Sequence, residues 1–549
     1  MANRRDFMKG IGLGAATLAL PPWLAPRGAS AADAPAASAA PAVSGAAGRK
    51  PNIVYILADD LGYGDLACQN PKSKIPTPHM DRLATQGVRF SDAHDPTAVC
   101  TPTRYGILTG RYCWRSPMKT GVLGGFSPPL IAPDRLTVPA LLRQHGYATA
   151  CIGKWHLGMT WPRKDGAGKG KGAAENSIDF AQPITDGPCT RGFDYYFGIS
   201  ASLDMPPYVF IENDRTVALP TATQERLKEG YVRQGPKDPD FKLEDVLPRF
   251  TKRATEYIAE RATGHAGQPF FLYLALNAPH TPIVPAEFVK GRSQAGDYGD
   301  YVVEVDWTVG EVLKALDEHR LADDTLVIVT SDNGPEVIAY ARAEKYRHFS
   351  MGELRGVKRD VWEGGHRVPF LARWPGRIKP GTVCDEVICH TDLLATAAAI
   401  VGAKLPDNAG EDSYSILPAL VGEKLDRPIR EATVHHSCNG KFAIRKGQWV
   451  LIDARSGGDN KVPEWFDAER GYKPNDQPGE LYDLMQDLAE RRNLYAEQPD
   501  KVRELKTLLE QYKDNGRSTP GAPQKNDVSV DIWKLKAGQP VGAAASVPE

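Results

Sequence analysis

Four apolar runs constrain the fold of this chain most strongly. They begin near residues 52, 147, 270 and 325, and polar residues follow each of them at once. Helical patterns separate the runs, and strands that alternate with helices form a mainly parallel sheet. The sequence therefore predicts an α/β fold with a large, mainly parallel sheet flanked by helices. Because ligands of such sheets bind beyond the carboxyl ends of the strands, we expect these polar residues to meet at one edge.

The polar residues after two of the runs are oxygen donors. Asp59 and Asp60 follow the first run, and Asp332 and Asn333 follow the fourth. Adjacent carboxylates at the end of a buried strand repel each other unless a cation lies between them, and oxygen ligands favour Ca²⁺ or Mg²⁺. A solvated turn or a helix cap would explain the first pair if it stood alone. The four donors together predict a calcium site, with Mg²⁺ as the alternative, because the set is too acidic and too poor in imidazole for zinc.

Basic residues follow the other two runs. Lys154 and His156 come after the run near residue 147, and His280 comes after the run near residue 270. Lys154 and His156 are two positions apart in extended chain, so they can share one face. Taken singly, each of the three is more often a surface or structural residue than a catalyst. Together at one sheet edge they are candidates for binding an anionic ester.

A cysteine just before a helical pattern is the candidate nucleophile. Cys100 is followed by Pro102, which suits the first turn of a helix, and then by Arg104. The free N–H groups and positive dipole of a helix N-terminus bind anions, and an arginine one turn later adds a bidentate cation. A lone cysteine is more often a small buried hydrophobe than a catalyst. The functional interpretation therefore depends on the residues around it.

Several motifs resemble those of one enzyme family. Residues 100–104 are similar to the Cys-x-Pro-x-Arg signature of the type I sulfatases, which belong to the alkaline-phosphatase-like superfamily, and residues 109–111 continue that signature as Thr-Gly-Arg. The Gly-Lys-Trp-His-Leu-Gly sequence of residues 153–158 and the lysine-to-Glu-Gly-Gly segment of residues 352–365 resemble further sulfatase motifs. The resemblance covers roughly residues 51–512. It implies an alkaline-phosphatase-like fold and a sulfuric ester hydrolase of the arylsulfatase type.

The resemblance also implies a modified cysteine and roles for its neighbours. In these enzymes the cysteine is oxidised to formylglycine, whose hydrate attacks sulfur with one oxygen and later expels sulfate through the second. A formylglycine-generating enzyme would then act on this chain during maturation. Lys154 and Arg104 would hold the sulfate, His156 would act as base, and His280 with a further lysine would protonate the leaving alcohol, although the two histidine roles can be exchanged. The implied catalytic residues are Cys100, Arg104, Lys154, His156, His280 and Lys358, and the implied metal ligands are Asp59, Asp60, Cys100, Asp332 and Asn333.

The chain divides into four parts by composition and motif. Residues 1–31 carry a twin arginine, an apolar run of ten residues and a small-residue end, the pattern of a twin-arginine signal peptide. A membrane-spanning helix needs about twenty apolar residues, which disfavours the alternative of a membrane anchor. Residues 32–50 predict a flexible linker, residues 51–425 a catalytic domain, and residues 426–549 a C-terminal sheet-plus-helix subdomain and tail. We expect export through the twin-arginine translocase to the periplasm or beyond, with no stable membrane span in the mature protein.

The substrate is constrained less tightly. The formal net charge of −1 gives no bias toward nucleic acid. General similarity favours a sulfated carbohydrate or an aryl sulfate, with 6-O-sulfated galactose or N-acetylgalactosamine as candidates. Asp204 and Tyr208 lie in an aperiodic stretch and are candidate sugar contacts, although an ordinary loop role is the default. Two alternatives stay open: a phosphodiesterase or phosphonate monoester hydrolase of the same superfamily, and a catalytically silent sulfated-glycan binder that would be expected to lack a nucleophile or ligand.

Overall fold

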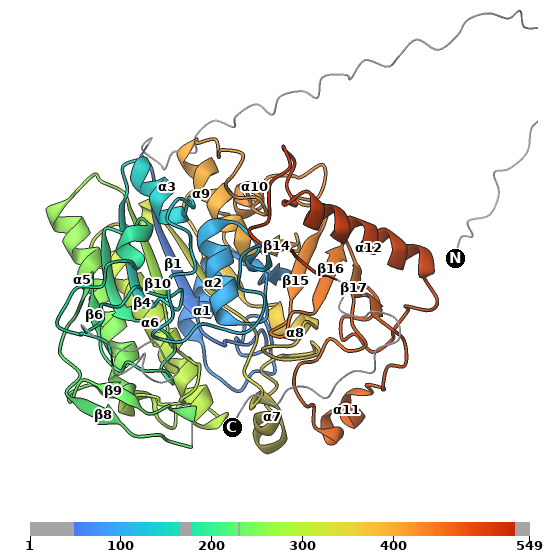
Figure 1. Ribbon diagram of the computed structural model, residues 1–549, viewed down its shortest axis with the longest axis horizontal. Helices are drawn as coiled ribbons and strands as arrows, with labels where there is room; N and C mark the ends of the chain where they lie inside the picture. The colour runs from blue at the N-terminus through green and yellow to red at the C-terminus, as the bar shows by residue number, and fades with distance from the viewer. Residues whose placement is uncertain (1–48, 165–176, 229–230, 533–549) are drawn as a thin grey trace, which may run out of the picture. The chain divides into compact units, whose positions relative to one another are not determined.

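The computed structural model describes residues 49–164, 177–228 and 231–532 (Figure 1). The predicted signal peptide and all but the last two residues of the predicted linker lie outside these ranges. The same holds for the end of the predicted C-terminal tail, from residue 533 onward. No helix within the described ranges combines the length and the apolar character needed to cross a bilayer.

A ten-stranded sheet forms the centre of the described chain. The four predicted strands are all present as neighbours in its middle, in the order β11, β1, β10, β4, and they run parallel to one another. β5 extends the parallel part, and antiparallel pairings occur toward both edges. The predicted α/β fold with a mainly parallel sheet is therefore confirmed. The order is β13 (Thr382–Cys384), β2 (Val88–Phe90), β12 (Phe370–Arg373), β11 (Thr325–Ser331), β1 (Asn52–Ala58), β10 (Phe270–Ala275), β4 (Ala148–Lys154), β5 (Tyr195–Ile199), β6 (Ile211–Glu212) and β7 (Arg215–Thr216).

Helices cover both faces of this sheet (Figure 1). Side chains alternate along β1, so that Tyr55 and Leu57 pack on one face and Val54 and Ile56 on the other. All seven residues of β1 are buried, as a strand with helices on both sides requires. The first face packs against α2 (Cys100–Thr109), α3 (Val138–Gln144) and α9 (Leu393–Val401), and the second against α1 (Pro78–Gln86), α5 (Val246–Gly264) and α6 (Gly296–Glu318).

The register of the central strands brings their carboxyl ends to one level. Ala58, the last residue of β1, pairs with Ser331, the last residue of β11. On the other side of β1, Leu57 pairs with Ala275 of β10, which in turn pairs with Gly153 of β4. The residues that come next on each strand therefore leave the sheet side by side, as the sequence predicted.

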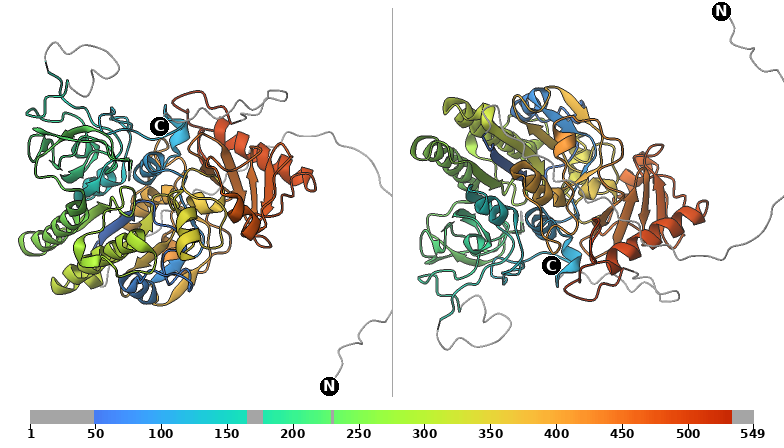
Figure 2. Two further views of the ribbon diagram at one scale, coloured as in Figure 1. Left: turned by 90° about the horizontal axis from the view of Figure 1, so that it is seen from below. Right: turned by 90° about the horizontal axis from the view of Figure 1, so that it is seen from above.

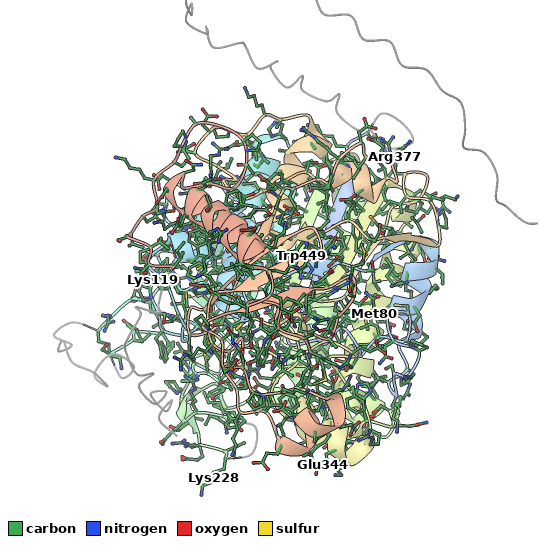
Figure 3. All side chains as sticks on the ribbon, turned by 90° about the vertical axis from the view of Figure 1, so that its right-hand side faces the viewer. Met80, Lys119, Lys228, Glu344, Arg377 and Trp449 are labelled. Atoms are coloured by element: carbon green, nitrogen blue, oxygen red, sulfur yellow. The ribbon has the colours of Figure 1, made fainter. Side chains whose placement is uncertain are left out.

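A second, smaller sheet lies in the C-terminal part. It is antiparallel, and Leu505 and Leu509 of α12 (Pro499–Asp514) share a hydrophobic cluster with its residues Ile444 and Leu451. Figure 2 shows α12 against the strands, and Figure 3 labels Trp449, which packs on the same cluster. This confirms the predicted small sheet with a helix, whereas the boundary near residue 425 stays a prediction. Its strands, in order, are β15 (Thr433–His436), β16 (Phe442–Lys446), β17 (Trp449–Ile452) and β18 (Glu480–Asp483).

Short elements connect these layers. β3 pairs with β14, and β8 pairs with β9, each as a two-stranded unit. Their bounds, with those of the remaining α-helices, are β3 (Ala93–His94), β14 (Ile388–Cys389), β8 (Ala222–Gln224), β9 (Gly235–Lys237), α7 (Ala339–Tyr346), α8 (Glu363–His366), α10 (Leu417–Leu420) and α11 (Glu464–Arg470).

Candidate active site

The candidate nucleophile is the first residue of a buried helix. α2 begins at Cys100, after Val99 in extended conformation, and Pro102 lies in its first turn, as predicted. Every residue of this helix is buried, including Arg104 one turn on. A charged residue at such a depth needs partners of opposite charge or good hydrogen bonds.

Arg104 ties the helix to the ends of two strands. Its Nε and Nη2 atoms lie 2.8 and 2.7 Å from Oδ2 of Asp332, and its Nη1 donates to the carbonyl oxygen of Lys154 at 3.0 Å. Asp332 directly follows β11, and Lys154 ends β4. The arginine thus fixes the start of α2 against the carboxyl ends of β11 and β4.

The two aspartates after β1 take part in the same network. Lys154 Nζ donates to Oδ2 of Asp59 at 2.6 Å, and Lys358 Nζ donates to Oδ2 of Asp60 at 2.9 Å. The side-chain amide of Asn333 donates to Oδ1 of Asp60 at 2.7 Å. All five side chains are buried. Residues from positions 59 to 358 of the sequence are therefore joined by hydrogen bonds into one network.

Two oxygens of this cluster lack a hydrogen bond within the described chain. Oδ1 of Asp59 and Oδ1 of Asn333 are buried and have no hydrogen-bond partner among the described residues. One ligand atom each from Asp59, Asp60 and His280 lie within 4.8 Å of one another. Burial alone would raise the pKa of Asp59, but Lys154, His280 and Arg104 hold it below its usual range, so this carboxylate stays ionised. A free carboxylate oxygen and a free amide oxygen beside a second aspartate suit a hard divalent cation.

The two site histidines differ in what their ring nitrogens face. Nε2 of His156 lies 2.7 Å from the carbonyl oxygen of Leu123, so it donates, and the buried Nδ1 is left as an acceptor without a partner in the described chain. Burial and the nearby charges of Lys154 and Arg104 lower the pKa of His156 well below its ordinary value. His280 directs Nδ1 to the carbonyl oxygen of Thr281 and has Nε2 3.8 Å from Oδ2 of Asp60. Both histidines border the aspartate cluster.

Two site residues have an unusual backbone. Asp60 and His156 have φ values of 67° and 56°, in the left-handed region that residues other than glycine rarely adopt. Such conformations cost free energy and persist where the surrounding structure requires them, often at functional sites. Here they turn the chain sharply just beyond β1 and β4.

The Cys100 thiol lies in the field of these groups. Burial raises the pKa of the thiol to about 11. The positive charges of Lys154 and Lys358 lower this pKa, and the negative charges of Asp332 and Asp59 raise it. The unmodified thiol is therefore protonated at neutral pH, and the cations around it are insufficient to make it a thiolate nucleophile.

One of the two predicted sugar contacts has a different place in the structure. Tyr208 is 1% exposed and belongs to the hydrophobic core, and its hydroxyl lies 2.6 Å from the carbonyl oxygen of Arg233 and 2.9 Å from that of Asp204. Because its polar atom is used to hold the loop together, Tyr208 has a packing role in this structure, and its contact with a sugar stays a prediction. Asp204 has Oδ2 3.6 Å from Arg233 and Oδ1 without a partner in the described chain, so its contact with a sugar stays a prediction.

The sequence reasoning missed Glu336. Its carboxylate is buried, binds both Nη atoms of Arg359, and lies 3.5 Å from Lys358 Nζ. Burial would raise its pKa, but Arg359 and Lys358 hold it below the ordinary range. A signal was present, because Glu336 follows Asp332 and Asn333 within four residues.

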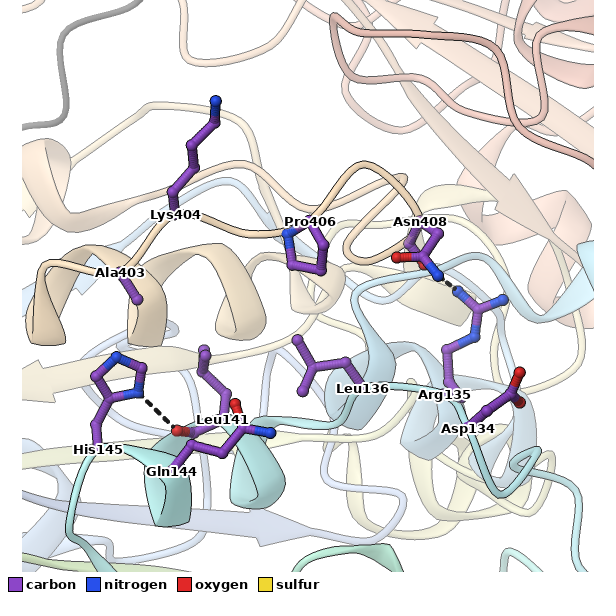
Figure 4. Close-up of a pocket in the computed structure, with 10 residues that line it drawn as sticks. All are labelled: Asp134, Arg135, Leu136, Leu141, Gln144, His145, Ala403, Lys404, Pro406 and Asn408. Carbon is purple, nitrogen blue, oxygen red and sulfur yellow. Dashed lines mark hydrogen bonds between the residues drawn. The ribbon is translucent and has the colours of Figure 1, made fainter.

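A cavity of about 410 Å³ lies away from these groups (Figure 4). Residues 134–145 and 403–408 line it, next to the amino end of β4 and so at the opposite end of that strand from Lys154. Figure 4 shows His145 bonded to the carbonyl of Leu141 and Arg135 bonded to that of Asn408. None of the predicted catalytic residues or metal ligands lines this cavity.

Comparison with known proteins agrees with this geometry. The sulfatase family model matches residues 51–403, and a model of the N-sulphoglucosamine sulphohydrolase C-terminal region matches residues 356–515. The chain is 36% identical to an N-acetylgalactosamine-6-O-sulfatase of Bacteroides thetaiotaomicron, over 85% of this chain and 93% of that protein.

Solved structures show the same fold. A sulfatase structure from Bacteroides thetaiotaomicron, determined in work on the metabolism of multiple glycosaminoglycans, aligns with a TM-score of 0.72 at 36% identity and covers 84% of this chain and 99% of its own. A phosphonate monoester hydrolase of Agrobacterium radiobacter aligns with a TM-score of 0.55 at 17% identity, covering 85% and 96%, which shows a shared fold alone. The chain therefore belongs to the type I sulfatase family of the alkaline-phosphatase-like superfamily and is a sulfatase.

Proposed function

We propose that this sulfatase removes sulfate from a sulfated carbohydrate by means of a formylglycine at position 100 and a bound Ca²⁺. The observation that supports this most is the convergence at one sheet edge of three carboxylates, an amide oxygen and three cationic side chains on the start of α2. Hydrolysis adds water across the S–O ester bond and yields an alcohol and sulfate. The site must therefore bind the anionic sulfate group, supply an oxygen nucleophile and protonate the leaving alcohol.

The residues present fit a calcium ion. Asp59, Asp60, Asp332 and Asn333 would hold it, and the oxygens of Asp59 and Asn333 that lack partners are the atoms such an ion would satisfy. When bound, the ion would draw negative charge from the sulfate oxygens. In this structure Lys358 is hydrogen-bonded to Asp60. Because Asp60 would share its charge with the bound ion, Lys358 would become available to the substrate.

Arg104 and Lys154 would bind the sulfate group. Both are buried cations, Arg104 one turn into α2 and Lys154 at the end of β4, and both carry hydrogen-bond donors fixed in direction by Asp332 and Asp59. Donors set in place before the reaction stabilise the charge that develops on sulfate oxygens without reorganising. Formylglycine at position 100 would supply the attacking hydroxyl there.

The histidines are suited to proton transfer. His156 presents an unprotonated Nδ1 that has no partner in the described chain, so it can accept a proton from a hydroxyl at position 100. His280 and Lys358 both contact Asp60 and would protonate the leaving oxygen from that side. Exchange of the two histidine roles stays an alternative.

We further propose a carbohydrate substrate of the 6-O-sulfated galactose or N-acetylgalactosamine class. The support is the 36% identity to an N-acetylgalactosamine-6-O-sulfatase over most of both chains. Export through the twin-arginine translocase, a periplasmic or secreted location and maturation by a formylglycine-generating enzyme belong to the same proposal. They rest on the sequence alone.

Mass spectrometry tests the nucleophile directly. A tryptic digest of protein from its native host yields the peptide of residues 90–104, which ends at Arg104. We expect an aldehyde at position 100, and an unmodified thiol in fully active protein would contradict the proposal. Turnover of an aryl sulfate, a phosphate diester and a phosphonate monoester by the same sample tests the reaction class. Faster turnover of either phosphorus ester would favour a hydrolase of the other type.

A further inference from the structure

We propose that Arg359 forms a subsite for a second anionic group of the substrate, next to the sulfate that is removed. This inference rests on the proposed sulfatase reaction and goes beyond it, because it names a residue and a substrate property that the catalytic set does not include. The group it would take is a carboxylate or a second sulfate on the same or the adjoining sugar.

The first argument is where the guanidinium lies. Arg359 follows Lys358, and neighbouring residues in extended chain point in opposite directions. The φ value of Arg359 is 81°, however, and this left-handed backbone turns both side chains toward one carboxylate. Glu336 lies 3.0 Å from Nη2 of Arg359 and 3.5 Å from Nζ of Lys358. The two cationic heads are thus separated by a single carboxylate.

The second argument is that the backbone is held in this conformation. The N–H of Arg359 donates to the carbonyl of Ala98, two residues before Cys100, and its carbonyl accepts from the N–H of Cys438. The carbonyl of Lys358 accepts from the side chain of Asn460. The strained φ is therefore imposed from both sides and beside the nucleophile, as is typical of sites where strain serves function.

The third argument is the charge that remains. In this structure, the positive charge of Lys358 is balanced by the carboxylates of Asp60 and Glu336 together. When Asp60 binds a metal ion, Glu336 alone must balance both Lys358 and Arg359, which leaves excess positive charge. The side chain of Arg359 is 36% exposed, whereas that of Lys358 is 4% exposed. The deep lysine can serve the sulfate that is removed, and the partly exposed arginine faces a group farther out.

A pair of ligands that differ in one acid group tests this subsite. N-acetylgalactosamine 6-sulfate carries one anionic group, and a chondroitin 6-sulfate disaccharide adds a uronic acid carboxylate to the same sulfated sugar. Binding of both is measured by calorimetry in a Cys100→Ala background with Ca²⁺, so that neither ligand is consumed. We expect the disaccharide to bind more tightly, and Arg359→Gln to lower that preference by about tenfold, the usual effect of one charge-assisted hydrogen-bonding partner. The ratio of the two affinities cancels any general loss of binding.

Arg347 provides a matched control. It is also an arginine with a left-handed backbone, at φ 53°, and it is paired through both Nη atoms with one glutamate, Glu469, but its side chain is 55% exposed and makes no contact with Lys358. Arg347→Gln should leave the preference for the disaccharide intact. Equal affinities of the two ligands, or a preference that survives Arg359→Gln, would overturn the subsite. The proposed reaction is tested separately with the protein that keeps Cys100. If that protein released no sulfate from either ligand, the proposed reaction would be overturned, whatever the binding preference.

Discussion

Two of the clusters of buried ionisable side chains in the described part of the chain differ in their place in the fold and in how their charges are paired. In the first, at the edge of the main sheet, Asp59 and Asn333 each keep an oxygen without a partner in the described chain. In the second, between the main sheet and the small sheet, both oxygens of Asp92 bind Arg445, and Arg367 binds Glu363 at 3.1 Å. Oε1 of Glu363 in the second cluster also lacks a hydrogen-bond partner among the described residues. Neither buried charge nor a free oxygen alone therefore identifies the active site, whereas a position beyond the carboxyl ends of parallel strands does.

The histidines of the second cluster make the same point. Nε2 of His366 lies 3.1 Å from the carbonyl of Val361, and Nδ1 of His435 lies 2.9 Å from the carbonyl of Asp95. The two rings stack with centroids 3.9 Å apart and planes within 6° of each other. Ring nitrogens of His94, His366 and His435 lie within 4.8 Å of one another, but the stacked pair packs the end of α8 against β15 of the small sheet. The first cluster should thus control activity and the second stability.

The largest effect is expected from Asp332. Asp332→Asn keeps the size of the side chain but removes a carboxylate from the proposed calcium site and the charge that pairs with Arg104. Even residues that only support metal ligands cost about 10–100-fold in activity when they are changed, so we expect kcat/KM for an aryl sulfate to fall at least about 100-fold. Steady-state kinetics with and without excess Ca²⁺ measures this, and added Ca²⁺ should recover part of the loss. Unimpaired turnover would count against the assignment.

The corresponding change in the second cluster should have the opposite outcome. Asp92→Asn leaves Arg445 and Arg367 short of one buried negative charge, and breaking a buried ion pair typically costs about 3–5 kcal/mol. We expect that decrease in the free energy of unfolding, measured by urea denaturation, with little change in kcat/KM. Glu497→Gln is the control, because its pair with Arg492 is solvent-exposed and should contribute less than about 1 kcal/mol. A variant of Asp92 that is stable but inactive would refute the division between the clusters.

The sequence predicted the first cluster far better than the second, for a physical reason. Asp59, Lys154 and Asp332 each follow an apolar run directly, and parallel strands in register must bring such positions together. Asp92 and Arg445 are 353 positions apart and lie on a loop and on a strand of the small sheet, so no strand register relates them.

Two features near the active site are hard to predict from the sequence for a similar reason. Tyr208 lies in a stretch without periodicity, where a sequence gives no sign of which polar groups are used by the backbone. The contact of Arg359 with Glu336 depends on one left-handed residue, and in extended chain the side chain would point away. Both features depend on backbone conformations that no hydrophobic pattern predicts.

The smallest effect is a change in how stability depends on pH. Burial lowers the pKa of His435 well below its ordinary value, with support from His366. Below about pH 6.5 the unfolded chain binds a proton at this residue and the folded chain does not, so His435 makes stability fall as the pH falls, by about 1.4 kcal/mol per pH unit. Glu304 and Asp306, whose pKa values burial raises to about 7, act in the opposite sense, because the folded chain holds their protons up to that pH.

The change in slope between variants therefore isolates each group. Between about pH 6.5 and 5, His435→Gln should lower the slope of the unfolding free energy against pH by about 1.4 kcal/mol per unit, and Asp306→Asn should raise that slope by a similar amount. Urea denaturation at several pH values measures both. If His435→Gln left the slope unchanged, the ring would have to be protonated in the folded state. The second cluster would then hold a further buried positive charge besides Arg367 and Arg445, and its role would resemble that of the active-site edge more closely than its contacts indicate.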